Sequence, residues 1–342
     1  MALFWYFCHD EKEKKRMEDI SQTLMNWYDS NKRSLPWRET SDPYAIWVSE
    51  IILQQTRVAQ GYDYFLRFMD AFPTVQALAH ASEDEVLRLW QGLGYYSRAR
   101  NMHSAARQIV SLGEFPSTFE RILNLKGIGP YTAAAIGSFA FGLPCAVVDG
   151  NVCRVMSRLF AIEEPIDSKA GKRLVEQFAQ SLLPEGQSAR YNQAVMEFGA
   201  LQCVPSSPDC SVCPLADKCL ALARGLVGVL PCKSHRTKVT DRFFHYFLIE
   251  DGESLYLHKR DADDIWRGLY ELPLKEVESS DAEEEMLPVK SVRHVLSHQI
   301  IHAKLYHRVL PGPLPQREGC IVVRRSEIDK YALPRLVQIL LE

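Results

Sequence analysis

Residues 203–219, Cys203-Val-Pro-Ser-Ser-Pro-Asp-Cys210-Ser-Val-Cys213-Pro-Leu-Ala-Asp-Lys-Cys219, place four cysteines in one short segment with the spacing C-x6-C-x2-C-x5-C. The prolines prevent one continuous helix, because proline lacks a backbone N–H and fixes φ. The loop can therefore turn all four thiols toward one point. Compact, unequal spacings are typical of iron–sulfur clusters, whereas zinc sites usually contain two C-x2-C pairs. The spacing favours an iron–sulfur cluster over zinc.

The composition of the 342-residue chain is that of a globular protein, with 46% hydrophobic and 24% charged residues. Its length predicts two domains. A net charge of −3 does not indicate general nucleic-acid binding, so such a role depends on a local patch. No apolar run is long enough to span a membrane, and the apolar start Ala2–Phe7 lacks the features of a signal peptide. We expect a cytoplasmic protein of the bacterial cytosol, where thiols stay reduced instead of forming disulfides.

Apolar residues recur at helical spacing from residue 17 to residue 225, and prolines divide this region into short helices. We therefore predict a mainly α first domain over residues 17–225, preceded by an N-terminal extension over residues 1–16. Glycines, a proline and basic residues predict a linker over residues 226–241.

Residues 242–342 are rich in aromatic and β-branched residues and are expected to form a smaller α+β domain. The acidic segment Glu276–Glu285 is expected to be a solvated loop. Strands are expected at Phe243–Ile249, Ser254–Leu257 and Ile321–Val323.

The segment Leu125-Lys-Gly-Ile-Gly-Pro-Tyr-Thr132 joins a predicted helix, Phe119–Leu125, to a second one. Gly127 and Gly129 allow a tight turn, and the free N–H groups at the start of the next helix suit an anion. This arrangement predicts a hairpin that holds a DNA phosphate without reading the base sequence. An ordinary helical hairpin is the alternative.

Two carboxylates have patterns that suit catalysis. Asp149 follows two valines at the start of a predicted helix, where it is either a helix cap or a group that stabilises positive charge on a sugar. Glu50 lies in an apolar helical run, and burial raises the pKa of a carboxyl group as a general acid requires. Pairing with an arginine is the alternative for Glu50. Two such carboxylates would match the chemistry of glycosidic-bond hydrolysis.

These motifs resemble the helix-hairpin-helix DNA glycosylases that carry an iron–sulfur cluster. The segments Leu35–Arg38, Asp42–Tyr44, Glu50–Thr56 and Gln91–Asn101 are similar to those of the adenine DNA glycosylases, which remove adenine mispaired with 8-oxoguanine. The resemblance covers about residues 20–340. It implies a six-helix barrel with an iron–sulfur domain, and a 4Fe-4S cluster held by Cys203, Cys210, Cys213 and Cys219.

The resemblance also implies roles for individual residues. Glu50 would protonate adenine, Asp149 would stabilise the oxocarbenium ion, and Tyr131 and Asn151 would orient them. The adenine pocket would be lined by Trp37, Arg38, Leu53, Gln193 and Met196. Gln55 and Tyr95 would lie near 8-oxoguanine, and the phosphate hairpin would comprise Gly127, Gly129, Tyr131 and Thr132. Plain packing in a helical core is the alternative for each pocket residue.

The C-terminal domain resembles the Nudix-like module that these enzymes use to recognise 8-oxoguanine. The Glu-rich helix of a Nudix hydrolase is absent after Trp266–Pro273, so nucleotide hydrolysis is not expected. The family's Phe-Ser-His loop is represented by Leu296, Ser297 and His298, and leucine cannot stack as phenylalanine does.

We therefore expect a monomeric enzyme acting on duplex DNA with adenine opposite 8-oxoguanine or guanine. One alternative is an endonuclease III-like glycosylase and lyase, but that enzyme has a lysine where this chain has Tyr131, and tyrosine cannot form a Schiff base. The other alternative is a non-catalytic DNA-binding module in which the cluster has a structural role.

Overall fold

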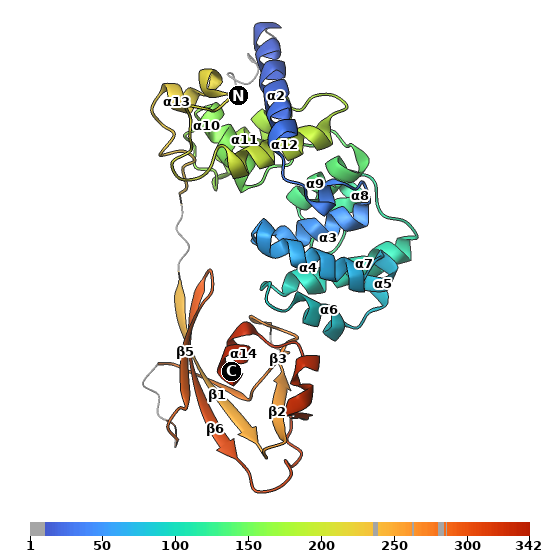
Figure 1. Ribbon diagram of the computed structural model, residues 1–342, viewed down its shortest axis with the longest axis vertical. Helices are drawn as coiled ribbons and strands as arrows, with labels where there is room; N and C mark the ends of the chain where they lie inside the picture. The colour runs from blue at the N-terminus through green and yellow to red at the C-terminus, as the bar shows by residue number, and fades with distance from the viewer. Residues whose placement is uncertain (1–10, 235–238, 262, 280–283, 285) are drawn as a thin grey trace. The chain divides into compact units, whose positions relative to one another are not determined.

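The computed structural model describes residues 11–234, 239–261, 263–279, 284 and 286–342 (Figure 1). The chain forms two compact units, one of Met1–Tyr62 with Ser111–Arg236 and one of Asp63–Val110 with Thr237–Glu342. Each unit combines two separate stretches of the chain, whereas the domains expected from the sequence are consecutive stretches. The expected domain boundaries stay a prediction. Within the described residues, no helix is both long and apolar enough to cross a membrane.

The first unit is built from helices, as the sequence predicts. Its α-helices are α2 (Glu11–Asn31), α3 (Pro43–Leu53), α8 (Phe119–Leu123), α9 (Pro130–Phe141), α10 (Gly150–Leu159), α11 (Lys169–Ser181), α12 (Ser188–Leu201) and α13 (Leu220–Ala223), with the 3-10 helices η1 (Pro36–Arg38) and η2 (Ala216–Lys218). Residues 11–16, which the sequence assigns to an N-terminal extension, instead continue α2. Residues 1–10 of that extension lie outside the described residues.

Helix α12 packs against α2, α10 and α9, and α3 packs against α9. Ile20 and Leu24 on α2 meet Val195 and Phe198 on α12 in a core that excludes water. Their spacing of three and four residues places each pair on one helix face. This packing sets the positions of α3, α9, α10 and α12, which carry the site described below.

The second unit combines helices with a sheet. The helices include α5 (Val75–His80), α6 (Glu83–Trp90) and α14 (Arg335–Leu341), the 3-10 helix η3 (Arg325–Lys330), and most of α4 (Val58–Ala71) and α7 (Ser97–Leu112). Ser82 and Glu85 form a capping box at the start of α6. The strands are β1 (Thr240–Glu250), β2 (Ser254–Lys259), β3 (Tyr270–Glu271), β4 (Leu274–Val277), β5 (Lys290–Val295), β6 (Gln299–Val309) and β7 (Cys320–Arg324).

The sheet has the order β3-β2-β1-β6-β5, with β4 paired to β1 and β7 paired to β2. Strands β1 and β6 run parallel from Thr240↔Gln299 to Glu250↔Val309, and the other pairs are antiparallel. Helix α14 packs against β5 and contributes Leu336 and Leu340 to the core (Figure 1). The mainly α and α+β fold class is confirmed.

Two details of the predicted loops are wrong. Thr240 and Asp241, assigned to the linker, begin strand β1 because β6 offers a full-length parallel partner. Glu276, assigned to a solvated loop, lies in β4 and accepts hydrogen bonds from Arg242. Part of both segments lies outside the described residues.

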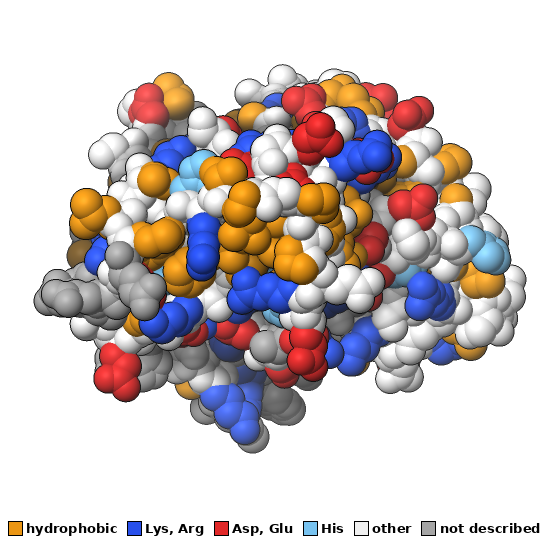
Figure 2. All heavy atoms as spheres, turned by 90° about the horizontal axis from the view of Figure 1, so that it is seen from below, with side chains coloured by type: hydrophobic (Ala, Val, Ile, Leu, Met, Phe, Trp, Pro, Cys, Tyr) orange, Lys and Arg blue, Asp and Glu red, His pale blue; other side chains and the backbone are white. Residues whose placement is uncertain are grey.

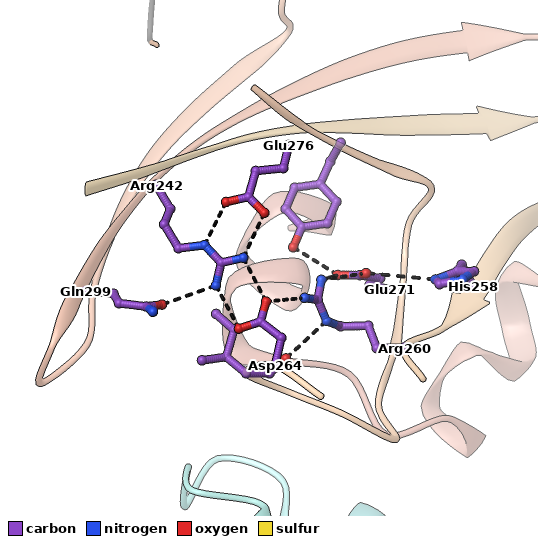
Figure 3. A network of polar contacts seen from close by, with 9 residues as sticks. Arg242, His258, Arg260, Asp264, Glu271, Glu276 and Gln299 are labelled. Carbon is purple, nitrogen blue, oxygen red and sulfur yellow. Dashed lines mark hydrogen bonds and ion pairs between the residues drawn. The ribbon is translucent and has the colours of Figure 1, made fainter. Parts of the chain in front are cut away.

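A polar network joins residues of the sheet to Arg260 and Asp264, which follow β2 (Figure 3). Arg242 Nη2 lies 2.7 Å from Asp264 Oδ2, and Arg260 Nη2 lies 3.0 Å from the same oxygen. Arg260 also pairs with the buried Glu271 at 2.8 Å, and Tyr246 donates to Glu271 at 3.1 Å. Because buried charges need partners, these contacts hold Asp264 and Glu271 in place around Arg260.

Surface charge shows no dominance of one sign on the face drawn in Figure 2, where Lys and Arg are interspersed with Asp and Glu around a central group of hydrophobic side chains. This agrees with the small net charge of −3. Any nucleic-acid contact therefore depends on local groups.

Candidate active site

Helix α3 carries Glu50 into the protein interior. Asp42 caps this helix by accepting hydrogen bonds from the backbone N–H groups of Tyr44 and Ala45. Glu50 is only 7% exposed, and Tyr131 donates a hydrogen bond to Glu50 Oε2 at 2.8 Å. Burial raises the pKa of Glu50 to about 7, although the Tyr131 hydrogen bond opposes the shift. A substantial fraction of Glu50 is therefore protonated near neutral pH.

Asp149 is the N-cap of α10 and also faces a cavity. Its Oδ1 accepts from the backbone N–H of Val152 at 2.7 Å, and its Oδ2 accepts from Asn151 Nδ2 at 2.8 Å. Burial raises the pKa of Asp149 above its ordinary value, while the hydrogen bonds from Val152 and Asn151 act in the opposite direction. Capping and a role in the cavity are thus compatible, because the cap occupies only one carboxylate oxygen.

Asn151 is itself held by Arg154. Arg154 Nη2 donates to Asn151 Oδ1 at 2.8 Å and to the carbonyl of Gly199 at 2.6 Å, and Arg154 Nε donates to the carbonyl of Cys203 at 2.7 Å. A chain of hydrogen bonds therefore runs from Asp149 to the backbone of the first cysteine in the loop 203–219.

One cavity of about 460 Å³ brings these groups together. Every adenine-pocket and catalytic residue expected from the sequence lines it: Trp37, Arg38, Glu50, Leu53, Tyr131, Asp149, Asn151, Gln193 and Met196. Glu50 and Asp149 come from two different helices, separated by about a hundred residues of chain. Their convergence in one cavity gives an acid and an anion for a single substrate.

Arg33 and Glu197 are among the lining residues that the sequence did not predict. Glu197, whose side chain is 1% exposed, accepts hydrogen bonds from Arg33 at 2.6 Å and from Arg38 at 2.7 Å. Burial raises the pKa of Glu197, but the hydrogen bonds from Arg33 and Arg38 lower it to about 2. Glu197 is thus a fixed anion that orients two guanidinium groups. The signal was present, because Glu197 also lies in an apolar helical run.

The hairpin between α8 and α9 turns at Gly127, whose φ of +77° favours glycine, whereas Gly129 is extended and caps α9 without a side chain. Both glycines are exposed. The side chains of Tyr131 and Thr132 point inward, where Thr132 Oγ1 accepts from Gln54 at 3.2 Å. The exposed groups of this hairpin that could meet an anion include its backbone at Gly127 and Gly129 and the side chain of Lys126.

The four cysteines of the loop 203–219 line one small cavity, next to the buried Arg158. Arg158 Nη1 lies 3.4 Å from Cys203 Sγ, and the guanidinium also binds the carbonyls of Val204 and Pro205. Among the described residues, no three His, Cys, Asp or Glu side chains converge as metal ligands. The donor set of four thiols, with a cation beside one of them, is chemically suited to a thiolate-bound metal cluster.

Two family models match the chain. Residues 48–184 match the HhH-GPD superfamily base excision DNA repair protein, and residues 245–342 match the NUDIX domain. The adenine DNA glycosylase of Buchnera aphidicola subsp. Acyrthosiphon pisum is 32% identical over 94% of this chain and 97% of its own length. The chain belongs to the adenine DNA glycosylase family. It is therefore a base-excision-repair enzyme.

Other relatives agree with this membership. The human adenine DNA glycosylase is 44% identical over 59% of this chain and 39% of its own length. A solved thermostable thymine-DNA glycosylase, 27% identical, aligns with 61% of this chain and 98% of its own at a TM-score of 0.57. A non-covalent endonuclease III–DNA complex aligns at 0.54 with 22% identity, covering 62% of this chain and 98% of its own, which shows likeness of fold alone.

A second cavity of this adenine DNA glycosylase, about 450 Å³ in volume, lies in the second unit. It is lined by Tyr95, Leu296, Ser297 and His298, together with Trp266, which the sequence did not single out as a site residue. The hydroxyl oxygens of Tyr95 and Ser297 lie 2.5 Å apart. Gln55, exposed after the end of α3, lines neither cavity.

Three residues within the sequence motifs described above have a strained backbone. Gln55, Tyr95 and Trp266 have φ values of +57°, +46° and +61°, in the left-handed region that ordinary side chains seldom adopt. Such conformations persist where the surrounding structure holds them and are common at binding sites.

Proposed function

We propose that this adenine DNA glycosylase hydrolyses the N-glycosidic bond of adenine mispaired with 8-oxoguanine or guanine in duplex DNA, and that it does not cut the strand. The observation that carries this proposal is the pairing of Glu50 and Asp149 in one cavity of about 460 Å³. A base must leave the stack to reach such a cavity.

The proposed reaction begins with Glu50 in its protonated form, which burial favours. Glu50 donates its proton to N7 of adenine as the bond between C1′ and N9 breaks and its electron pair moves to the base. Asp149, held by Val152 and Asn151, stands opposite the positive charge that develops on the sugar. Water then adds to C1′ and gives a proton to the Glu50 carboxylate, which leaves free adenine, an abasic site and Glu50 again protonated.

Strand cleavage is not expected, because the position of the Schiff-base lysine of endonuclease III is occupied by Tyr131. The hydroxyl of Tyr131 is committed to Glu50, and burial raises the pKa of Tyr131 well above its ordinary value. A neutral phenol of this kind cannot act as an amine nucleophile.

We further propose that Cys203, Cys210, Cys213 and Cys219 hold a 4Fe-4S cluster. When bound, the cluster would supply iron–thiolate bonds that fix the loop 203–219. Burial raises the pKa of Cys213 to about 11, so its thiolate needs a nearby positive charge such as a metal. Iron and inorganic sulfide should fall in Cys213→Ala but not in Cys153→Ala, a cysteine outside the loop.

The second cavity supports recognition of 8-oxoguanine through Ser297. A serine hydroxyl can accept a hydrogen bond from the N7–H that distinguishes 8-oxoguanine from guanine. Tyr95 lies within hydrogen-bond distance of that hydroxyl, and Leu296 offers an apolar surface without an aromatic face.

A single-turnover assay tests the proposal. Duplexes with adenine opposite 8-oxoguanine are incubated with excess enzyme, and products are separated with and without alkali. We expect adenine release that becomes a strand break only after alkali, and its loss in Glu50→Gln. Strand breaks without alkali, or activity only on a thymine-glycol duplex, would favour the endonuclease III-like alternative. DNA binding without base release would favour the non-catalytic module.

A further inference from the structure

Tyr28 lies behind the cavity residue Gln193 and is bonded to it. Tyr28 belongs to α2, is 4% exposed and is not among the residues that line the 460 Å³ cavity. Its hydroxyl donates a hydrogen bond to Gln193 Oε1 at 2.5 Å. Because α2 packs against α12, this bond joins a core side chain of one helix to a cavity-lining side chain of the other.

The surroundings keep the Tyr28 hydroxyl protonated. Burial is the main cause that raises the pKa of Tyr28; Arg38 opposes it, and Glu197 and Asp29 add to it. The Arg38 guanidinium also lies 5.8 Å from the centre of the Tyr28 ring, a distance at which cation and ring attract each other. A neutral, restrained phenol is a dependable hydrogen-bond donor.

This bond decides which end of the Gln193 amide faces a substrate. Oε1 is turned toward Tyr28, so the amino group Nε2 is the remaining polar group, and it has no hydrogen-bond partner in the described part of the chain. If the amide flipped, Nε2–H could donate to the phenol oxygen, but the buried phenolic proton would lose Oε1 as its acceptor. Gln193 therefore offers a donor to the cavity.

We propose that Tyr28 is a positioning residue that sets the base selectivity of the enzyme by holding the Gln193 amide in this orientation. The inference rests on the proposed function. A donor is complementary to an unprotonated ring nitrogen, which adenine has at both N1 and N7. Since Glu50 serves N7 in the proposed reaction and N3 lies beside the glycosidic bond, N1 is the partner left for Gln193.

Bases with a protonated N1 should be rejected for the same reason. Hypoxanthine and guanine carry a hydrogen on N1, so a Gln193 donor would face another donor and leave both unpaired. Hypoxanthine is the sharper probe, because it lacks the 2-amino group of guanine and differs from adenine only at positions 1 and 6.

The test compares single-turnover excision of adenine and of hypoxanthine, each opposite 8-oxoguanine, by the cluster-containing full chain and by Tyr28→Phe. We expect the hypoxanthine-to-adenine rate ratio to rise about tenfold in Tyr28→Phe, since the freed amide can turn its oxygen toward N1–H. A ratio measured within one protein is insensitive to a general loss of stability or of active fraction.

Tyr191→Phe is the matched control. Tyr191 lies in the same core, is 1% exposed, and its hydroxyl has no hydrogen-bond partner among the described residues. Its removal should leave the ratio unchanged. An unchanged ratio in Tyr28→Phe, or an equal change in both variants, overturns the inference.

A second measurement needs no variant. The wild-type chain should excise 1-deazaadenine, which has C–H in place of N1, about tenfold more slowly than adenine. Equal rates overturn the inference while leaving the proposed function standing. If the wild-type chain releases no adenine at all, the proposed function and the inference are both refuted. This outcome differs from equal rates on the two bases, which refute only the inference.

Discussion

Two glutamates show what decides chemistry at the scale of single residues. Glu50 and Glu197 are both buried on apolar helices, yet burial raises the pKa of Glu50 to about 7 while two arginines lower that of Glu197 to about 2. In the sequence, both glutamates stand among mostly apolar residues of a helical run. The difference comes from Arg33 and Arg38, which are more than 150 residues distant from Glu197 in the chain. The local sequence pattern predicts that a glutamate is buried. Only the three-dimensional structure shows whether its neighbours raise or lower its pKa.

The pKa of Glu50 predicts the pH dependence of catalysis. Glu50 must be protonated to act as an acid, so the rate should fall as pH rises through about 7. Asp149 must be ionised, so the rate should also fall when pH drops far enough to protonate it. Adenine excision at limiting enzyme concentration, measured across pH, should give a bell-shaped profile. A flat alkaline limb would contradict the assignment of Glu50 as the acid.

At the scale of helices and strands, the close packing of α12 against α10 depends on one glycine. Gly199 lies where a Cβ atom would come within 2.7 Å of Asn151 Cβ and 2.9 Å of the Asn151 carbonyl oxygen. The helix ends and caps could be predicted from the sequence because Asp42, Ser82 and Asp149 act within three residues of their partners. The need for glycine at 199 could not, because the clashing atoms belong to another helix.

Gly199→Ala should therefore force α12 away from α10. We expect a loss of about 1–3 kcal/mol in the free energy of unfolding, as for other overpacked sites, and slower adenine excision because Asn151 moves. Thermal or denaturant unfolding and the single-turnover rate measure the two effects. Gly228→Ala is the matched control, since its Cβ would meet open space. Similar losses in both variants would argue against a packing cause.

The ion pair of Arg260 and Glu271 joins the residue that follows β2 to β3, and its removal is a second prediction at the scale of elements (Figure 3). Arg260→Met leaves a buried carboxylate with only Tyr246 as a strong partner, which should cost about 3–5 kcal/mol. The double variant with Glu271→Leu should recover much of that loss, because no buried charge remains. The unfolding free energies of the wild type, the two single variants and the double variant give the coupling energy between Arg260 and Glu271. No recovery in the double variant would indicate a role beyond charge pairing.

At the scale of the whole molecule, the sequence correctly predicts a helical part and a sheet-containing part, because hydrophobic periodicity differs between them. It does not predict that residues 63–110 group with the C-terminal sheet. Nor does it predict that β1 pairs in parallel with β6, 59 residues later, since long-range pairing leaves no local pattern. The cavity containing Tyr95 and Ser297 depends on both of these features.

Ser297→Ala tests whether that cavity contributes to substrate choice. Loss of one hydrogen bond to 8-oxoguanine should reduce the preference for adenine opposite 8-oxoguanine over adenine opposite guanine by about tenfold. The measurement is the ratio of the two single-turnover rates. Ser291→Ala, an exposed serine on β5, is the control and should leave the ratio unchanged. An unaltered ratio in Ser297→Ala would remove this cavity from the recognition of 8-oxoguanine.

The first residue of β1 has a consequence for how this enzyme can diverge. The backbone N–H of Thr240 donates to the carbonyl of His298 at 3.2 Å, so the last of the three chain connections between the units leads to a strand whose first residue is bonded to the loop that lines the second cavity. An insertion or deletion just before Thr240 would therefore displace that loop as well as change the length of the connection. Across the family, the length of this connection and the identity of residues at 296–298 should consequently change together, as coupled inherited traits.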